Sequence, residues 1–394
     1  MVAARRALPV LVLWAALAAP LSVLATRVRD WFDMTDELRY ERLAISIART
    51  HSLVPRVHGV NIESLSQLYP LLIAPVFASG YVPHDLFLAH LLNAWVMSSA
   101  CIPAFLLARR VTGRLDTAVV AGVLAVCIPW IIYSSMLMTE VAAYPAFLWA
   151  LLAMQRAVSA PSTRNDVVAL AALALAFFAR TALIVLVVVL PLAIVAYELG
   201  RSQGLRGRER LRRAARSHRV LGGAYVVLLT GAIVLSETGR LSRIVGIYGV
   251  YAHNASFLSS AFFGSLAEHA ATFALALAVL PAVIAAGWLF ANLVRPAAGR
   301  ELHAFACIGS LTMAATLVQG TDFDVRYTGY VHDRFLLYLA PVVVIGVLCA
   351  VIDQRRPRWS LLPPAALVAP VRGLNWRYSL GNQMPVYSKT FADG

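Results

Sequence analysis

Long apolar runs recur from one end of this 394-residue chain to the other, and they constrain its fold more than any other feature. A run of roughly 17–25 apolar residues can cross a lipid bilayer as a helix. Only 14% of the residues are charged, against about 25% in a typical soluble domain. The pattern predicts an all-α polytopic membrane protein, with candidate spans at 7–25, 86–108, 115–135, 141–158, 166–179, 181–199, 220–236, 265–291, 302–319 and 335–352.

The arginines indicate how the chain is threaded, because Lys and Arg accumulate in the cytoplasmic loops of membrane proteins. The segment 68–82 is apolar but short, and it contains Pro70, Pro75 and Gly80. If this segment does not cross, one side holds all the main clusters: Arg5/Arg6, Arg109/Arg110/Arg114, Arg156/Arg164, the arginines of 201–219, Arg295/Arg300 and Arg355/Arg356/Arg358. We therefore expect 68–82 to form a juxtamembrane helix within a first outer loop at 26–85.

This threading gives about 10–11 transmembrane helices, ten of them within residues 1–352, and a cytoplasmic N-terminus. A charged helix directly follows the first run, which favours a retained anchor over a cleaved signal peptide. Residues 353–394 are a short C-terminal segment. Its stretch "WSLLPPAALVAP" is either an eleventh span or a segment on the inner face.

The composition also excludes some classes. The net charge of +14 does not indicate nucleic-acid binding, because the positive charge follows the topology. The four cysteines lie in apolar runs, which is typical of small buried residues and not of disulfides or a metal site. Lys389 is the only lysine beside many arginines and alanines, a composition associated with GC-rich bacterial genomes. We therefore expect a bacterial plasma membrane.

Most of the 20 acidic residues fall on the outer side of this threading. In "WFDMTDELRYERLAISIART", residues 31–50, Thr35 can cap a helix whose first turn holds Asp36 and Glu37. They are either ordinary first-turn acids, which the helix dipole favours, or functional carboxylates. A second isolated acid, Glu140, stands where two spans meet at the same face, and a charge there is costly unless it is used or paired.

The order of these elements resembles the GT-C integral-membrane glycosyltransferases, in particular the protein O-mannosyltransferase and aminoarabinose transferase branch. The resemblance covers roughly residues 7–352 and implies a GT-C-like transmembrane catalytic domain. It rests on Asp36-Glu37 with Tyr40, Tyr69-Pro70, Glu140, Arg180 in a tight outer turn, and Arg334-Phe335 at the start of a late span. The lysine that often precedes the proline element in the family is absent here, and that element keeps one proline.

The resemblance implies an inverting enzyme that moves a sugar from a polyprenyl-phosphate donor to a glycan, lipid or protein acceptor of the cell envelope, at the outer face. A carboxylate can take the acceptor's proton, and arginines can hold the phosphate with paired hydrogen bonds. We assign Asp36 as the general base and Glu140 as a second catalytic carboxylate or a partner for a loop arginine. The expected substrate-binding residues are Glu37, Tyr40, Tyr69, Arg180 and Arg334.

Other interpretations remain open at this level. Arg180 could instead snorkel to the membrane surface, and Arg334 could pair with Asp333 or Asp324. No cofactor follows from the pattern; a divalent cation held by His332 or by Asp322 and Asp324 is a weaker alternative. A transporter or flippase of a lipid-linked saccharide is the rival function. Such proteins place ionisable groups near the bilayer midplane, whereas here the acids gather at the outer ends of the spans.

Overall fold

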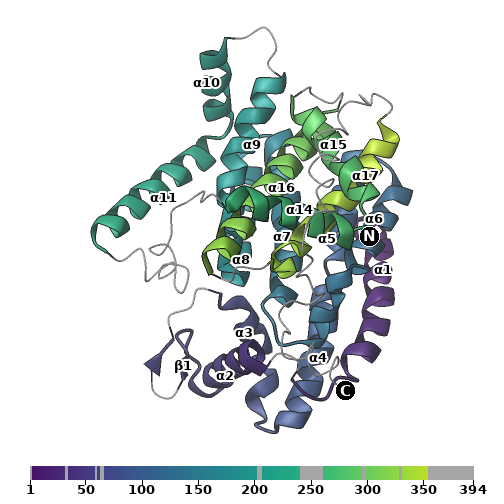
Figure 1. The fold of residues 1–394 in the computed structure, drawn as a ribbon, viewed down its shortest axis with the longest axis vertical. Helices are drawn as coiled ribbons and strands as arrows, with labels where there is room; N and C mark the ends of the chain where they lie inside the picture. Colours follow the sequence, from purple (N-terminus) through teal and green to yellow (C-terminus); the bar gives the residue numbers. More distant parts are fainter. Residues whose placement is uncertain are drawn as a thin grey trace.

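The computed structural model describes residues 2–31, 34–57, 60–62, 66–201, 206–239, 261–294, 299–327 and 331–353. Within these ranges the chain is a helical bundle (Figure 1). Its β structure there is one antiparallel two-residue pairing in the first loop, between β1 (Arg56–Val57) and β2 (Val60–Asn61). The predicted all-α polytopic fold is confirmed.

The helices of the first half are α1 (Val2–Ala25), α2 (Met34–Thr50), α3 (Leu68–Ile73), η1 (Val76–Ala78), α4 (Val82–Ser98), α5 (Cys101–Thr112), α6 (Leu115–Val126), η2 (Pro129–Ser135), α7 (Glu140–Ser159) and α8 (Thr163–Ala179). Those of the second half are η3 (Thr181–Ile184), α9 (Val185–Arg201), α10 (Gly207–Ser217), α11 (Arg219–Glu237), α14 (Phe262–Ala276), α15 (Leu280–Val294), α16 (Arg300–Tyr327), η4 (Asp333–Phe335), η5 (Leu337–Leu339) and α17 (Ala340–Ile352).

In the part of the chain that is described, seven helices are long and apolar enough to cross a membrane, and two bent helix pairs raise this number to nine. Helix α8 is also apolar but has only 17 residues. Adding α8 to the nine gives ten segments, which correspond one for one to the ten predicted ranges. The predicted C-terminal segment 353–394 lies outside the described residues, apart from Asp353.

The predicted span with the sharpest break is 265–291. Residues 265–291 were expected to cross continuously, but α14 and α15 meet at an angle of 117°. Helix α14 ends at Ala276, Leu277 is its C-cap, and Ala278 takes a positive φ of 56°. Pro281 follows in the first turn of α15, and a proline cannot donate the backbone hydrogen bond that a continuous helix needs there. A milder bend of 59° separates α6 from η2, where Pro129 stands.

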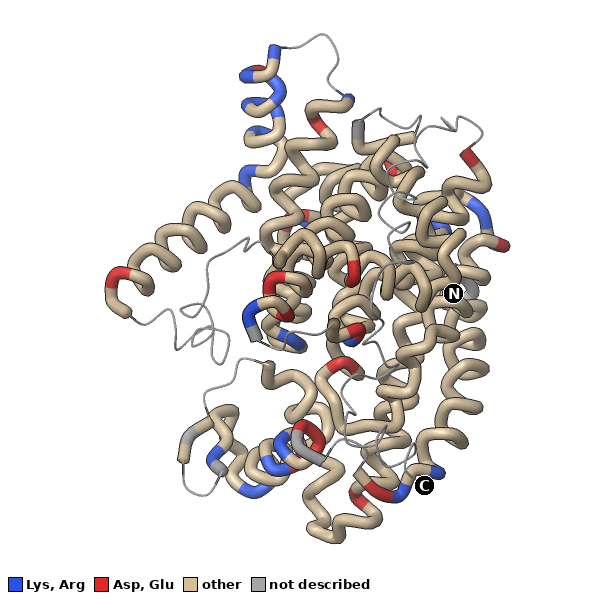
Figure 2. The backbone as a smooth tube through the Cα atoms, in the orientation of Figure 1, with Lys and Arg blue, Asp and Glu red and all other residues tan. Residues whose placement is uncertain are grey.

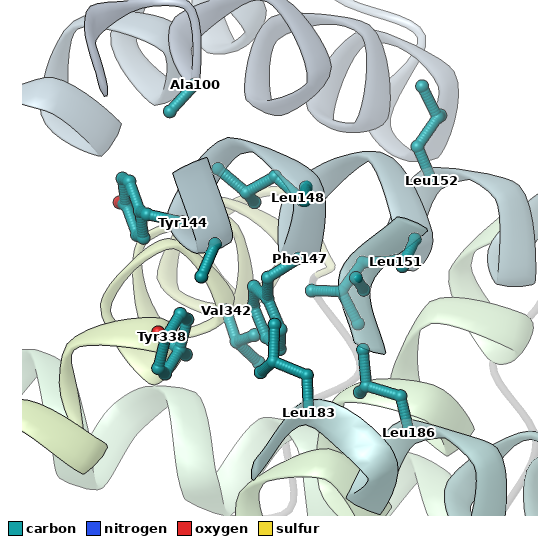
Figure 3. Close-up of a cluster of buried hydrophobic side chains, with 14 of the residues drawn as sticks. Ala100, Tyr144, Phe147, Leu148, Leu151, Leu152, Leu183, Leu186, Tyr338 and Val342 are labelled. Carbon is teal, nitrogen blue, oxygen red and sulfur yellow. The ribbon is translucent and has the colours of Figure 1, made fainter. Parts of the chain in front are cut away.

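Helix α7 forms the centre of the bundle, with nearly all of its side chains buried. Its alanines allow neighbouring helices to approach closely, as is usual in membrane interiors. Figure 3 shows its larger side chains packed against residues of η3 and α9 and against Tyr338 and Val342. The ring of Phe147 lies 5.3 Å from that of Tyr338. The Tyr144 hydroxyl donates to the Ala125 carbonyl at 2.6 Å, which ties α7 to α6.

The two ends of the bundle carry different polar contacts, and α7 runs from one end to the other. At the last turn of α7, Arg110 donates to Gln155 and to Ser159, and it lies 3.9 Å from Glu301 at the start of α16. The arginines of α10 gather at the upper end in Figure 2, away from α2 and the first loop. Glu140 is the first residue of the 20-residue α7, so it lies roughly 30 Å along the helix axis from the last turn, where Arg110 binds.

The first loop contains short helices, as predicted. Helix α3 has six residues and η1 has three, so neither can cross a bilayer. Tyr69, Ile73 and Phe77 are buried and belong to the main core, in which α3 and η1 contact α2. The segment 68–82 thus forms two short helices that pack beside α2 and the start of α4 (Figure 1).

Single cysteines test this topology. In a Cys127→Ser background, an impermeant thiol reagent applied from one side of sealed vesicles should label Val60→Cys and His84→Cys together, because the short helices between them do not span. Both positions are exposed, whereas the other native cysteines are buried. Arg114→Cys, in the turn before α6, should label only from the opposite side. Opposite sidedness for positions 60 and 84 would contradict the threading.

Candidate functional site

Four turns of the chain meet at the end of the bundle opposite the Arg110 cluster. They are the start of α2, the start of α7, the joint between α8 and η3, and the segment η4 that precedes α17. Each turn carries one of the charged residues singled out from the sequence. The fold brings Asp36, Glu140, Arg180 and Arg334 into one cluster.

Glu140 and Arg180 form an ion pair in the interior of this cluster. The Arg180 Nη1 contacts the Glu140 Oε1, and the side chains are only 7% and 1% exposed. Glu140 is the first residue of α7, where the helix dipole favours a negative charge. Arg180 adopts an extended conformation between α8 and η3, so no loop separates these helices. Arg180 therefore does not simply snorkel to the surface, and Glu140 has an arginine partner.

Arg334 and Asp36 form a second pair, across 298 positions of sequence. The Arg334 Nη1 donates to Asp36 Oδ2 at 3.2 Å. This pair is more open than the first: the Asp36 side chain is 31% exposed and that of Arg334 is 18% exposed. Of the alternative partners considered for Arg334, Asp333 accepts a hydrogen bond from Trp130 at 3.2 Å, and Asp324 binds two histidines.

The ring of Phe335 joins the two pairs. The guanidinium carbon of Arg180 lies 5.3 Å from the ring centroid, and that of Arg334 lies 5.5 Å from it. Both distances suit a cation–π contact. One aromatic ring thus contacts both cations, and the carboxylates of Glu140 and Asp36 offset the repulsion between them. Phe335 entered the sequence prediction only as part of a motif, because nothing local in the sequence marks its contact with Arg180.

Tyr40 and Tyr69 line the same region with perpendicular rings, whose centroids are 6.0 Å apart. Burial raises the pKa of the Tyr40 hydroxyl, and the negative charges of Asp36 and Glu140 raise it further. Tyr69 is 1% exposed and donates to Asn93 Oδ1 at 3.1 Å. Tyr40 is thus closer to the charged cluster, whereas the contacts of Tyr69 favour a role in positioning.

Glu37 is fully buried, although it is adjacent to the partly exposed Asp36. Its Oε1 accepts the backbone N–H of Leu137 at 2.9 Å, so it connects α2 to the segment just before α7. Neighbouring side chains on a helix point about 100° apart, which explains the two environments. Glu37 thereby holds the start of α2 against the site.

The sequence also allowed a divalent cation bound by His332 or by Asp322 and Asp324, as a weaker alternative. No group of three or more His, Cys, Asp or Glu side chains in the described ranges has a geometry that could hold a metal ion. Asp322 instead pairs with Arg326 one turn away, at 2.9 Å. Asp324 and His332 lie beside the site but bind each other and His269.

The fold and this cluster define a class: a polytopic helical membrane protein with two arginine–carboxylate pairs, one buried and one partly exposed, at one end of its bundle. No protein-family model matches the sequence, and no curated protein matches it. Two solved structures match the fold. Both are ArnT from Cupriavidus metallidurans, an aminoarabinose transferase of the GT-C superfamily.

The structure of ArnT bound to undecaprenyl phosphate matches with a TM-score of 0.55 and 18% identity, over 93% of this chain and 66% of ArnT. The apo structure of ArnT matches with a TM-score of 0.52 and 16% identity, over 98% of this chain and 69% of ArnT. The chain thus spans about two thirds of the length of ArnT. At this identity the likeness shows the fold alone: the arrangement of helices is similar to that of ArnT, as the resemblance led us to expect.

The buried ion pair predicts a large loss of stability when one partner is neutralised. Glu140→Gln leaves the Arg180 charge buried without its counter-ion, and removing one partner of such a pair costs roughly 3–5 kcal/mol. Asp322→Asn, in the more exposed pair with Arg326, should cost at most about 1 kcal/mol. Chemical unfolding of the detergent-solubilised protein measures both changes.

A charge-free double variant supplies the internal control. Glu140→Leu combined with Arg180→Met removes both charges, so it should recover much of the stability lost in Glu140→Gln. Equal losses for Glu140→Gln and Asp322→Asn would contradict the buried-pair interpretation.

Proposed function

We propose that this protein is a membrane glycosyltransferase that moves a sugar from a polyprenyl-phosphate donor to a cell-envelope acceptor at the outer face. One observation carries the proposal: Arg180 and Arg334 converge on the ring of Phe335, and each contacts a carboxylate. Two fixed cations beside an accessible carboxylate are what the transfer of a glycosyl group from phosphate requires. The complex of ArnT with undecaprenyl phosphate supports a polyprenyl carrier for this fold.

The two arginines have different roles in this proposal. Arg180 is fixed by Glu140 in the interior, so it supplies a stationary positive charge. Arg334 is more exposed, and a guanidinium has five N–H donors. It can therefore bind a phosphate oxygen and still donate to Asp36. Arginine suits this task because its planar donors match two phosphate oxygens at once.

Asp36 is the general base in this mechanism. The acceptor oxygen or nitrogen attacks the anomeric carbon while its proton passes to the Asp36 carboxylate. The bond between that carbon and the phosphate oxygen breaks, and its electron pair goes to the phosphate, which the arginines stabilise. Attack from the side opposite the phosphate inverts the anomeric centre. Asp36 suits the role better than Glu140, because 31% of the Asp36 side chain is exposed and Glu140 is buried in its ion pair.

A transfer assay tests the function itself. Membranes containing the protein are given radiolabelled polyprenyl-phosphate sugars, one sugar at a time, and the label is followed into the envelope acceptor fraction. We expect label in the acceptor and free polyprenyl phosphate as the second product. Movement of intact donor across sealed vesicles, without cleavage, would instead support a transporter.

Arg334→Gln should weaken donor binding strongly. Loss of a charge-assisted contact that leaves its partner desolvated costs roughly 2–5 kcal/mol. The matched control is Arg326→Gln, which removes an arginine that also pairs with an aspartate but has no contact with Phe335 among those observed. Equilibrium binding of undecaprenyl phosphate measures both. Equal affinities for the two variants would remove Arg334 from the phosphate site.

Asp36→Asn should reduce turnover while the protein still folds and binds donor. The substitution keeps an oxygen that can accept from Arg334, but the amide cannot take a proton. General-base catalysis typically contributes about 10²- to 10⁴-fold, so a loss of at least about 10²-fold is expected. Asp322→Asn is the control, since its carboxylate is 25% exposed and also pairs with an arginine. An Asp36→Asn protein with more than about a tenth of normal turnover at saturating substrates would exclude the role.

A further inference from the structure

Helix α10 connects two membrane-crossing segments, so its distance from the bilayer is limited. The candidate span before it ends at Arg201, and the span after it, α11, begins at Arg219. The 11 residues of α10 extend over roughly 16 Å, at about 1.5 Å per residue. The helix therefore stays close to the membrane surface. It lies at the end of the bundle away from α2, on the side predicted to be cytoplasmic (Figure 2).

One face of α10 packs against the protein. Arg210 donates to the Leu199 carbonyl at 2.8 Å, and Arg213 lies 4.0 Å from Glu198, so both arginines contact the last turns of α9. Ala214 is buried and belongs to the main core. These contacts determine which side of the helix is turned away from the bundle.

The face turned away from the bundle carries three arginines. Arg208, Arg212 and Arg216 are spaced four residues apart, so they lie within about 80° of one another around the helix axis, on the side opposite Ala214. All three are exposed. Arg219, at the start of α11, is exposed as well. The chain thus places four exposed cations within twelve residues at one membrane surface.

Among the contacts observed in the described residues, no acidic side chain binds these four arginines. The nearest acids in the sequence are engaged elsewhere: Glu209 accepts the backbone N–H of Arg206, and Asp166 binds His218. Like charges four residues apart on a helix destabilise it. The topology rule requires arginines in this loop, but it does not require them on one face. Their alignment therefore points to a negatively charged partner outside the chain.

The surroundings favour a lipid headgroup over a dissolved anion. Helix α11 continues directly from Arg219, and its Val226 and Val227 are 64% and 71% exposed. Apolar side chains exposed on a membrane span contact lipid, so lipid lies next to the arginines. Leu211 is 50% exposed beside Arg212, and an exposed apolar residue among arginines is typical of helices that bind at the membrane interface.

We propose that Arg208, Arg212 and Arg216 of α10, together with Arg219, bind the headgroups of anionic phospholipids in the inner leaflet. Guanidinium groups match phosphate oxygens with paired hydrogen bonds. Clusters of arginines just cytoplasmic of a membrane span attract anionic lipid, about fivefold for each basic residue near the surface. Bound headgroups neutralise the arginine face and hold the connection between α9 and α11 at the membrane. This site lies at the opposite end of the bundle from the donor phosphate, and it does not depend on sugar transfer.

The test uses the full-length protein in a neutral detergent, titrated with phosphatidylglycerol, and with phosphatidylcholine as the uncharged reference. Native mass spectrometry measures the affinity for each lipid. We expect tighter binding of phosphatidylglycerol. The triple variant Arg208→Gln, Arg212→Gln, Arg216→Gln should lose this affinity roughly 10- to 100-fold. The corresponding triple replacement by lysine keeps the charges and should lose much less.

A matched control removes the same charge from the same end of the bundle. Arg109, Arg156 and Arg300 are also exposed, but they stand on three different helices, α5, α7 and α16. Their triple replacement by glutamine should reduce the affinity for phosphatidylglycerol much less than the α10 variant does. Equal losses in the two triple variants would show that only the total charge matters, and would overturn the proposal.

Two further outcomes would also contradict it. Equal affinity of the native protein for phosphatidylglycerol and phosphatidylcholine would remove the preference for an anionic headgroup. Displacement of phosphatidylglycerol by excess inorganic phosphate, at constant ionic strength, would identify a dissolved anion as the ligand. The measurement contains no sugar donor, so its result is independent of the transfer assay.

Discussion

The ion pair between Glu140 and Arg180 is the interaction on which the arrangement of the site depends. Burying one charge in a membrane protein is costly unless an opposite charge meets it at close range. The pair therefore constrains α7 against the joint between α8 and η3. That joint is further fixed by its backbone: Thr181 N–H donates to Ser66 in the first loop, and Gln319 of α16 donates to the Ala182 carbonyl. With Arg180 held in this way, Phe335 can pack under it, and Arg334 next to Phe335 is directed towards Asp36.

Much of the fold could be predicted from the sequence, because the length of an apolar run and the positions of the arginines can be seen within a short stretch of the chain. Ten predicted ranges correspond to helical segments. The short helices of the first loop lie in 68–82, a segment whose prolines and small number of apolar residues exclude a spanning helix. The break at Leu277–Ala278 was not predicted, because the apolar run continues through it and only Pro281 marks the change. Hydropathy measures how apolar a segment is and not whether its helix is continuous.

The candidate site could be predicted only in part, since residue type and membrane side are visible in a sequence and partners are not. The four charged residues were expected at one membrane face, and the fold gathers them at one end of the bundle, but the pairing of Asp36 with Arg334 joins residues 298 positions apart. Adjacent Asp36 and Glu37 were assigned different roles, as general base and substrate-binding residue, but the sequence did not show that Asp36 is partly exposed while Glu37 accepts a backbone N–H inside the protein. His332 and Asp324 looked like a weak metal signal, because a sequence does not show that Asp324 lies between two imidazoles.

The charges of the cluster also explain why two arginines and two carboxylates suit the proposed reaction. Before a donor binds, the four charges sum to zero, which limits the cost of burying them. A donor phosphodiester adds one negative charge. During transfer Asp36 gains a proton and loses its charge, while the departing phosphate gains one, so the net charge of the site stays constant. The negative charge moves from Asp36 to the phosphate, and Arg334 is placed to interact with both. Its interaction with the leaving phosphate therefore strengthens as its interaction with Asp36 weakens. A fixed group whose favourable contacts grow along the reaction lowers the barrier rather than only tightening binding.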